Sequence, residues 1–124
     1  MPERSTKLTD RSKQFAISII RFYGALPKAG AGRVIGMQVL RSATSVGAHV
    51  REARRSRSIA EMISKTKCAL QEIDETSYWL ELLQESNLAS IEQLTDLRRE
   101  ADELTAMLVS SARTMTARKT KRRV

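Results

Sequence analysis

The chain is poor in cysteine, proline and aromatic residues, and it contains no long hydrophobic run. The single cysteine, Cys68, excludes an internal disulfide and fits a reducing cytoplasm, where we expect the protein to reside. No apolar stretch approaches the roughly 18 residues that a membrane-spanning helix needs. The polar first residues, MPERSTKLTDRSK, have no apolar segment of the kind found in signal peptides, so we expect none.

Residue clusters that support catalysis or metal binding are also missing from the sequence. His49 is the only histidine, and no cysteine or acid stands at metal-ligand spacing from it. Cys68 has no histidine partner recognisable by motif, and the segment 30–32 (Gly-Ala-Gly) lacks the Lys-Ser/Thr pair of a phosphate loop. The sequence contains no Glu-x-x-His pair, so it gives no indication of a di-iron bundle. We therefore expect a binding protein, not an enzyme, without a metal or a cofactor.

Charge is present in abundance and is sorted by position. Residues 1–57 carry twelve Lys/Arg and three Asp/Glu, whereas residues 58–112 carry four Lys/Arg and eleven Asp/Glu. Residues 113–124 add six Lys/Arg and no acid, which brings the chain to a net charge of +8. This sorting favours different partners for different surfaces, with a polyanion as the leading candidate for the basic ones.

Four stretches have helical periodicity, and Leu, Ile, Val, Ala and Met dominate their apolar positions. The first is predicted to start with Thr9 or Asp10 as its cap and to end near Leu26, before Pro27. The second begins near Arg33 and ends in a basic segment at 51–57. The third and fourth begin with capping boxes, Ser-Ile-Ala-Glu at 58–61 and Ser-Ile-Glu-Gln at 90–93, and run to about 86 and 115.

Each predicted helix has an apolar stripe. The second is expected to bury Val34, Met37, Leu40, Thr44, Gly47 and Val50. The third is expected to bury Met62, Thr66, Ala69, Ile73, Thr76, Leu80 and Leu83, and the fourth Leu94, Leu97, Ala101, Leu104, Leu108, Ser111 and Met115. Short loops between four such helices predict an all-α, antiparallel up-down-up-down four-helix bundle over residues 10–115. Residues 1–9 are predicted to be flexible, and 116–124 to form a basic disordered tail, because neither has an apolar face.

Two features hint at self-association. The stripe of the third helix is widened by Ile59, Ile63 and Leu70, so it is wider than a small bundle core requires. The segment 42–48 of the second helix is made of small residues, which let another helix approach closely. Gly47 within it costs a helix about 1 kcal/mol relative to alanine, so a packing reason is expected there.

The stretch from Gln38 to Leu83 resembles a known family of bacterial four-helix-bundle proteins, related to those encoded in the intervening sequences of large-subunit ribosomal RNA. The resemblance lies in the segments 38–46 (Gln-x-x-Arg-Ser-Ala-Thr-Ser-Val), 49–52 (His-Val-Arg-Glu), 55–58 with Glu61, and 78–80 (Tyr-Trp-Leu). Two positions depart from the family pattern. His49 stands where the family usually has asparagine, and Ala53 where it usually has a glycine that adopts positive φ after the helix, so this turn is expected to differ.

The resemblance implies an assembly and partners that the residues alone do not reveal. It implies a homopentamer of bundles around a central channel. Related members include the accessory variability proteins of diversity-generating retroelements, for which it implies nucleic acid or a reverse transcriptase as a partner, and for most other members it implies no established activity. Of the two nucleic acids, we expect RNA more than DNA. The resemblance also assigns a structural role to the motif residues Gln38, Arg41, Ser45, His49, Glu52 and Trp79, and we expect Arg41 and Glu52 to form ion pairs.

Arginines at the end of the second helix give the strongest functional signal. We predict that Arg51, Arg54, Arg55 and Arg57 contact nucleic-acid phosphates, because the planar guanidinium binds two oxygens at once. The alternative is that these arginines pair with acids of the third and fourth helices. Trp79 and Tyr78 are expected in the core or at an interface, because they fall within a Leu-rich stretch.

The C-terminal segment adds a second group of predicted nucleic-acid-binding residues: Arg113, Arg118, Lys119, Lys121, Arg122 and Arg123. A basic arm adds salt-dependent affinity through counterion release. It contains no aromatic residue on which a base could stack. The alternative is a solubilising end without a partner.

Two hypotheses of function follow. In the first, an oligomeric protein binds RNA or DNA through its basic patches. In the second, the protein is an adaptor whose acidic 58–112 segment docks a basic partner, such as a reverse transcriptase, while the arginines hold the oligomer together. An adaptor would purify free of nucleic acid, which distinguishes the two.

Overall fold

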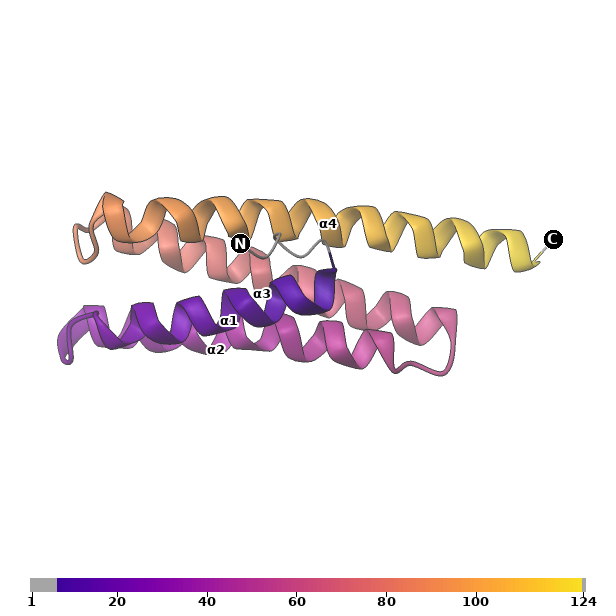
Figure 1. Ribbon diagram of the computed structural model, residues 1–124, viewed down its shortest axis with the longest axis horizontal. Helices are drawn as coiled ribbons and strands as arrows, with labels where there is room; N and C mark the ends of the chain where they lie inside the picture. Colours follow the sequence, from indigo (N-terminus) through magenta and orange to yellow (C-terminus); the bar gives the residue numbers. More distant parts are fainter. Residues whose placement is uncertain (1–6, 124) are drawn as a thin grey trace, which may run out of the picture.

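The computed structural model describes residues 7–123, with side chains to residue 122, and folds them into four helices. These are α1 (Leu8–Gly24), α2 (Gly30–Arg54), α3 (Ile59–Glu85) and α4 (Ile91–Arg123). Successive helices run in opposite directions, and each packs against its two neighbours (Figure 1). The predicted all-α, up-down-up-down bundle is therefore confirmed. Within 7–123 no helix combines the length and the apolar character needed to cross a membrane.

The two capping boxes set the starts of α3 and α4 as predicted. The Ser58 hydroxyl accepts a hydrogen bond from the Glu61 amide at 3.1 Å. At α4 the exchange is reciprocal, since the Ser90 hydroxyl accepts from the Gln93 amide at 3.2 Å and the Ser90 amide donates to Gln93 Oε1 at 2.9 Å. Asn87, with φ of 59°, ends α3 in the left-handed conformation that terminates many helices.

The starts of α1 and α2 lie earlier than predicted. Helix α1 begins at Leu8 with Lys7 as its N-cap and without a side-chain cap, so neither Thr9 nor Asp10 caps it. The earlier start lets Leu8 pack against the core. Helix α2 begins at Gly30 instead of Arg33. Residues 1–6 of the predicted flexible N-terminus lie outside the described residues.

The core is built from aliphatic residues at heptad spacing, with Phe15 and Phe22 from α1. Its fully buried members include Phe15, Ile19, Val39, Ala43, Val46, Ala69, Ile73, Leu80, Leu83, Leu94, Leu104 and Leu108. The predicted stripes of α3 and α4 match this core, except that Met62 and Ser111 are half-buried. The stripes thus fix how α3 and α4 are rotated about their axes.

The predicted stripe of α2 is wrong for most of its length. Val34 is 62% exposed and Met37 50% exposed, and the helix buries Val39, Ala43 and Val46 in their place, whereas Val50 of the predicted stripe is buried as expected. The small residues explain the rotation, because Gly36 faces the Leu26 side chain and Gly47 faces the Ser12 backbone of α1. A Cβ at Gly47 would lie 3.5 Å from the Ser12 carbonyl oxygen, which is an ordinary contact, so the position faces α1 but its packing does not require a glycine.

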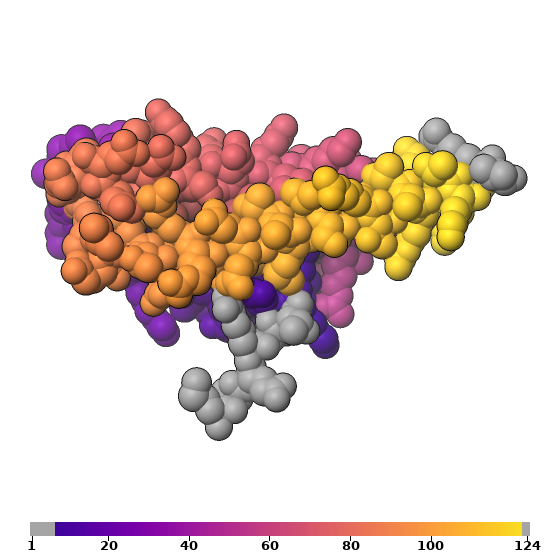
Figure 2. Space-filling view, turned by 90° about the horizontal axis from the view of Figure 1, so that it is seen from above, coloured from indigo at the N-terminus to yellow at the C-terminus, as the bar shows by residue number. Residues whose placement is uncertain are grey.

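The structure corrects the predicted disordered tail, because α4 continues as a helix through Arg123. We call residues 116–123 the α4 extension. Met115 is the last buried residue of the helix, and the extension projects past the α2–α3 loop and the start of α1 (Figures 1 and 2). Alanine, arginine and lysine favour helix, and cations in the last turns interact favourably with the helix dipole. An apolar face is therefore not needed for this segment to continue the helix.

Candidate nucleic-acid interface

The antiparallel bundle brings the two predicted basic groups to the same end of the molecule. Helix α2 ends there in Arg51 and Arg54, the α2–α3 loop adds Arg55 and Arg57, and the α4 extension leaves from the same end (Figure 1). We call this region the basic end. Its described predicted residues are Arg51, Arg54, Arg55, Arg57, Arg113, Arg118, Lys119, Lys121 and Arg122. The side chain of Arg123 lies outside the described part of the chain.

A pocket of about 350 Å³ lies between the end of α2 and the part of α4 that precedes the extension. It opens among the first turn of α1, the last turn of α2, the first turns of α3 and the end of the packed part of α4. Arg54 of α2 and Met115 of α4 both line it. Residues far apart in the sequence therefore border one hollow at the root of the α4 extension.

The core seam of α4 changes character at this pocket. Leu104, Leu108 and Met115 are buried, and the same helical spacing continues to Arg118 and Arg122, both exposed. The face of α4 that packs in the bundle is thus continued, in the extension, by cations. Within residues 7–123, no other helix packs against this face of the α4 extension, so these cations remain in contact with water.

The cations of the basic end have no ion-pair partner among residues 7–122, which speaks against the alternative that they pair with acids of α3 and α4. Arginines elsewhere do pair: Arg11 of α1 contacts Glu100 at 2.6 Å and Glu103 at 3.2 Å on α4. Glu61 lies in the first turn of α3, beside the α2–α3 loop, and it forms no ion pair with an arginine or lysine of the described residues. The charge of the basic end is therefore available to a partner.

A groove of about 1020 Å³ extends the basic end along the outer side of α1 and α2. Lys13 of α1 and Arg51, Arg54 and Arg55 line it, together with the small residues Ala16, Thr44, Gly47 and Ala48. Asp10 and Glu52 also border it. Lys13 was not among the predicted residues, since only the antiparallel pairing of α1 with α2 places it beside Arg51.

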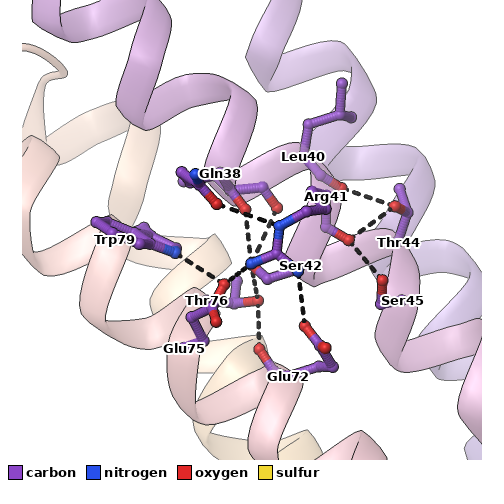
Figure 3. A network of polar contacts seen from close by, with 11 residues as sticks. Gln38, Leu40, Arg41, Ser42, Thr44, Ser45, Glu72, Glu75, Thr76 and Trp79 are labelled. Carbon is purple, nitrogen blue, oxygen red and sulfur yellow. Dashed lines mark hydrogen bonds and ion pairs between the residues drawn. The ribbon is translucent and has the colours of Figure 1, made fainter.

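Three motif residues meet in a polar network between α2 and α3 (Figure 3). The Arg41 guanidinium pairs with Glu75 and, at 3.4 Å, with Glu72, and its Nε donates to Gln38 Oε1 at 3.1 Å. Trp79 Nε1 donates to the same Glu75 carboxylate at 3.1 Å. Gln38, Arg41 and Trp79 therefore act together to hold α2 against α3. The acids that complete the network were not singled out by the sequence.

Beneath this network lies a buried hydroxyl pair. Thr76 Oγ1 donates to Ser42 Oγ at 2.7 Å, and both side chains are fully buried. The Ser42 hydroxyl donates in turn to the Gln38 carbonyl at 2.9 Å. Ser45 donates to the Arg41 carbonyl at 2.8 Å, so this motif residue bonds within its own helix. Satisfied polar groups at these positions fix the register of α2 on α3.

The remaining motif residues lie near the basic end. Glu52 pairs with Lys65 of α3 at 2.8 Å, and His49 Nδ1 lies 3.5 Å from Glu52 without a hydrogen bond among the described residues. The hydrogen bond from Lys65 lowers the pKa of Glu52 and correspondingly raises the pKa of Lys65. Ala53 is buried within α2, and Arg55 caps the helix at φ of −94°, so the turn forms without positive φ.

The two neighbouring aromatic residues of α3 have different environments. Trp79 is half-buried against the core, whereas Tyr78 is 54% exposed, with ring centroids 5.2 Å apart. Tyr78 is therefore not a core residue. It lines a shallow hollow with Asp74, Glu75 and Glu81 on the acidic face of α3.

Comparisons with known proteins add the following. The sequence profile of a family described as 23S rRNA-intervening sequence protein matches residues 4–110. A crystal structure from Bacteroides thetaiotaomicron, described as a protein with unknown function from the S23 ribosomal protein family, has a TM-score of 0.81 to this chain. It is 37% identical in sequence, and the match covers 86% of this chain and 98% of that chain. No curated protein matches the chain.

Proposed function

Because the chain belongs to the 23S rRNA-intervening sequence protein family, we propose that it is a cytoplasmic, non-enzymatic nucleic-acid-binding protein whose basic end contacts the phosphate backbone. The observation that carries the proposal is the gathering, at one end of the bundle, of cations without an ion-pair partner among residues 7–122. The family description supports RNA over DNA as the ligand.

Binding of this kind depends on charge and on release of counterions. Each phosphate neutralised by an arginine or lysine releases condensed cations, so the logarithm of affinity falls linearly with the logarithm of salt concentration. The guanidinium groups of Arg54, Arg55 and Arg57 can each bind two phosphate oxygens at once. The ammonium groups of Lys119 and Lys121 act as point charges. Such contacts position a backbone and carry no sequence information by themselves.

Charge reversal at the loop tests the proposal. Replacing Arg54, Arg55 and Arg57 together by glutamate should weaken binding of a structured RNA and reduce the salt slope by about one unit for each phosphate that the variant no longer neutralises. Fluorescence anisotropy of labelled RNA, measured over a range of salt concentrations with the full chain, gives both quantities.

A matched control exists at the other end of the bundle. Arg21, Lys28 and Arg33 are exposed and have no ion pair with a described residue, so their reversal to glutamate gives the same change in net charge. This control should retain most of the affinity. Equal decreases in affinity for both variants would show that net charge alone governs binding, and an unchanged salt slope in the loop variant would contradict the proposal.

The proposal includes assembly into a homopentamer, which the family likeness suggests. The outer side of α1 and α2 supports self-association, because Ile20, Val34 and Met37 are large apolar side chains at least half exposed to water. Exposed apolar side chains mark an interface where they form a continuous patch, and Val34 and Met37 are neighbours one turn apart on α2. A ring of copies would repeat the basic end and so convert weak sites into one multivalent surface.

A second candidate function is favoured by the acidic face of α3. Tyr78 stands exposed among Asp74 and Glu81, a surface suited to a basic protein segment. In this function the protein is an adaptor for a nucleic-acid enzyme, such as a reverse transcriptase. The ratio of absorbance at the nucleic-acid and protein maxima separates the candidates, since an adaptor purifies without bound nucleic acid.

A further inference from the structure

The pocket at the root of the α4 extension has apolar walls and a cationic rim. Its walls include Leu8, Val50, Ala53, Met62, Leu108 and Met115. Arg54 stands at its edge and has no ion pair with a described residue. The volume of about 350 Å³ lies at the lower end of the range typical of pockets for small ligands. The pocket is therefore large enough for one planar ring system.

Polar groups in the pocket are few and differ in their availability. The Thr66 hydroxyl donates to the Met62 carbonyl at 2.8 Å and is thereby occupied. The Ser111 hydroxyl forms no hydrogen bond within residues 7–122, and it lines the pocket. A hydroxyl both donates and accepts, so Ser111 can bond either kind of group on the edge of a ring.

The cationic groove adjoins this pocket, and Arg54 lines both of them. The groove also presents Lys13, Arg51 and Arg55. Of the two carboxylates that line it, Glu52 is paired with Lys65 at 2.8 Å, and Asp10 lies at the α1 side, so cations outnumber acids there. A row of cations beside an apolar pocket matches the chemistry of a nucleotide. Its phosphate carries charge, and its base has apolar faces and a polar edge.

We propose that the pocket receives an unpaired base of an RNA strand whose phosphates lie along the cationic groove. The inference rests on the proposed function and specifies which form of RNA that function prefers. In a duplex the bases are stacked and paired, so reaching the pocket would cost the energy of extruding one. The protein should accordingly bind single strands, loops or frayed ends more tightly than a blunt duplex of equal charge.

Filling the pocket tests the inference. Ser111→Met in the full chain removes the hydroxyl and adds an apolar chain where the base would lie. Ser110→Met is the matched control, because Ser110 is the adjacent exposed residue on the same helix and does not line the pocket. The probes are a labelled single-stranded RNA of roughly 12 nucleotides and a blunt RNA duplex of similar length.

We expect Ser111→Met to weaken single-strand binding roughly tenfold, because the base would no longer bury its apolar faces in the pocket, and to leave duplex binding within about twofold. Ser110→Met should change neither. Thermal unfolding of both variants, followed by circular dichroism, checks that each remains folded. A 2-aminopurine in the single strand should change its fluorescence on binding wild type and not on binding Ser111→Met.

Other outcomes overturn the inference, and they differ from those that overturn the proposed function. If both serine variants bind the single strand like wild type, the pocket takes no base, while binding through charge stands. Decanoate, a small amphiphile, tests a different occupant of the apolar pocket. If it raises the melting temperature of wild type and not of Ser111→Met, while the two proteins bind RNA equally well, the pocket binds a free amphiphile and not a base. If wild type binds neither probe at low salt, the proposed function itself fails.

Discussion

Arginine side chains in this protein differ in whether a carboxylate lies within reach. Arg41 is half exposed, yet Glu72 and Glu75 on the facing helix hold it in a network with Gln38 and Trp79. The loop arginines Arg54, Arg55 and Arg57 have no such partner among the described residues. Because a paired arginine has given up much of its capacity to bind phosphate, this difference separates structural cations from those that remain available to a ligand.

The Glu52–Lys65 ion pair has a pH dependence that follows from its pKa shifts. The pKa of Glu52 is lowered from its ordinary value of 4.5, so its contribution to stability is present above that value and is lost as pH falls through the lowered pKa. The pKa of Lys65 is raised from 10.5, so its contribution is lost only as pH rises through the raised pKa. The pair therefore contributes throughout the neutral range.

We expect Glu52→Gln to lower the free energy of unfolding slightly at about pH 7, and to lose this difference from wild type at an acid pH below the lowered pKa of Glu52. Urea denaturation at both pH values measures it. Glu81→Gln is the control, since Glu81 is exposed and has no ion pair with a described residue. A difference that persists unchanged at acid pH would mean that Glu52 acts through packing and not through its charge.

At the scale of the single residue, the sequence predicts a role but not a partner. The resemblance singles out Gln38, Arg41 and Trp79, and the structure brings these three together. The resemblance does not indicate which of the eleven acids of residues 58–112 pair with Arg41. The partners are Glu72 and Glu75, and they are determined by the register of α2 against α3. That register is set by buried contacts such as Thr76 with Ser42, which no local pattern reveals.

At the scale of the element, α3 and α4 were predicted well and α2 was not. Each of α3 and α4 has one apolar stripe and a capping box, so start and orientation follow from local sequence. Helix α2 has two apolar stripes, one through Val34 and Met37 and another through Val39 and Val46. Which of them is buried depends on the close approach of α1 at Gly36 and Gly47, a long-range property.

The α4 extension allows a separate prediction. A chain ending at Ala117 keeps the buried Met115 and lacks Arg118, Lys119, Lys121, Arg122 and Arg123. It should unfold at nearly the same temperature as the full chain, because nothing beyond Met115 is buried among the described residues. Its affinity for RNA should fall, and its salt slope should decrease by about one unit for each phosphate that the extension neutralises in the full chain. Anisotropy titrations over a range of salt concentrations measure both.

A full-length variant distinguishes charge from length. Replacing Arg118, Lys119, Lys121, Arg122 and Arg123 by glutamine keeps the helix and removes its charge, since glutamine is a comparable helix former. It should bind RNA as weakly as the shortened chain. If only the shortened chain is impaired, the extension contributes through its shape. If neither is impaired, the extension is not part of the interface.

At the scale of the whole molecule, the bundle separates two surfaces. Its basic end gathers the α2–α3 loop and the α4 extension, while the outer side of α1 and α2 carries exposed apolar residues farther along. By helical spacing, Ile20 follows Ala16 of the groove and Met37 precedes Thr44, so the apolar residues continue the sides of the cationic groove. An assembly through this apolar region would leave the basic end of each copy open to RNA.

The last prediction concerns this assembly. Met37→Glu places a charge in the exposed apolar region, and we expect it to convert the proposed oligomer to smaller species, measured by native mass spectrometry, because burying an unpaired carboxylate at an interface is costly. Affinity for a long RNA should fall as multivalency disappears, while binding of a short single strand stays the same. Ile91→Glu is the matched control, since Ile91 is 63% exposed at the start of α4. A Met37→Glu variant with the mass of wild type would place the contact between copies elsewhere, and the basic ends would then have to be brought together by another face of the bundle.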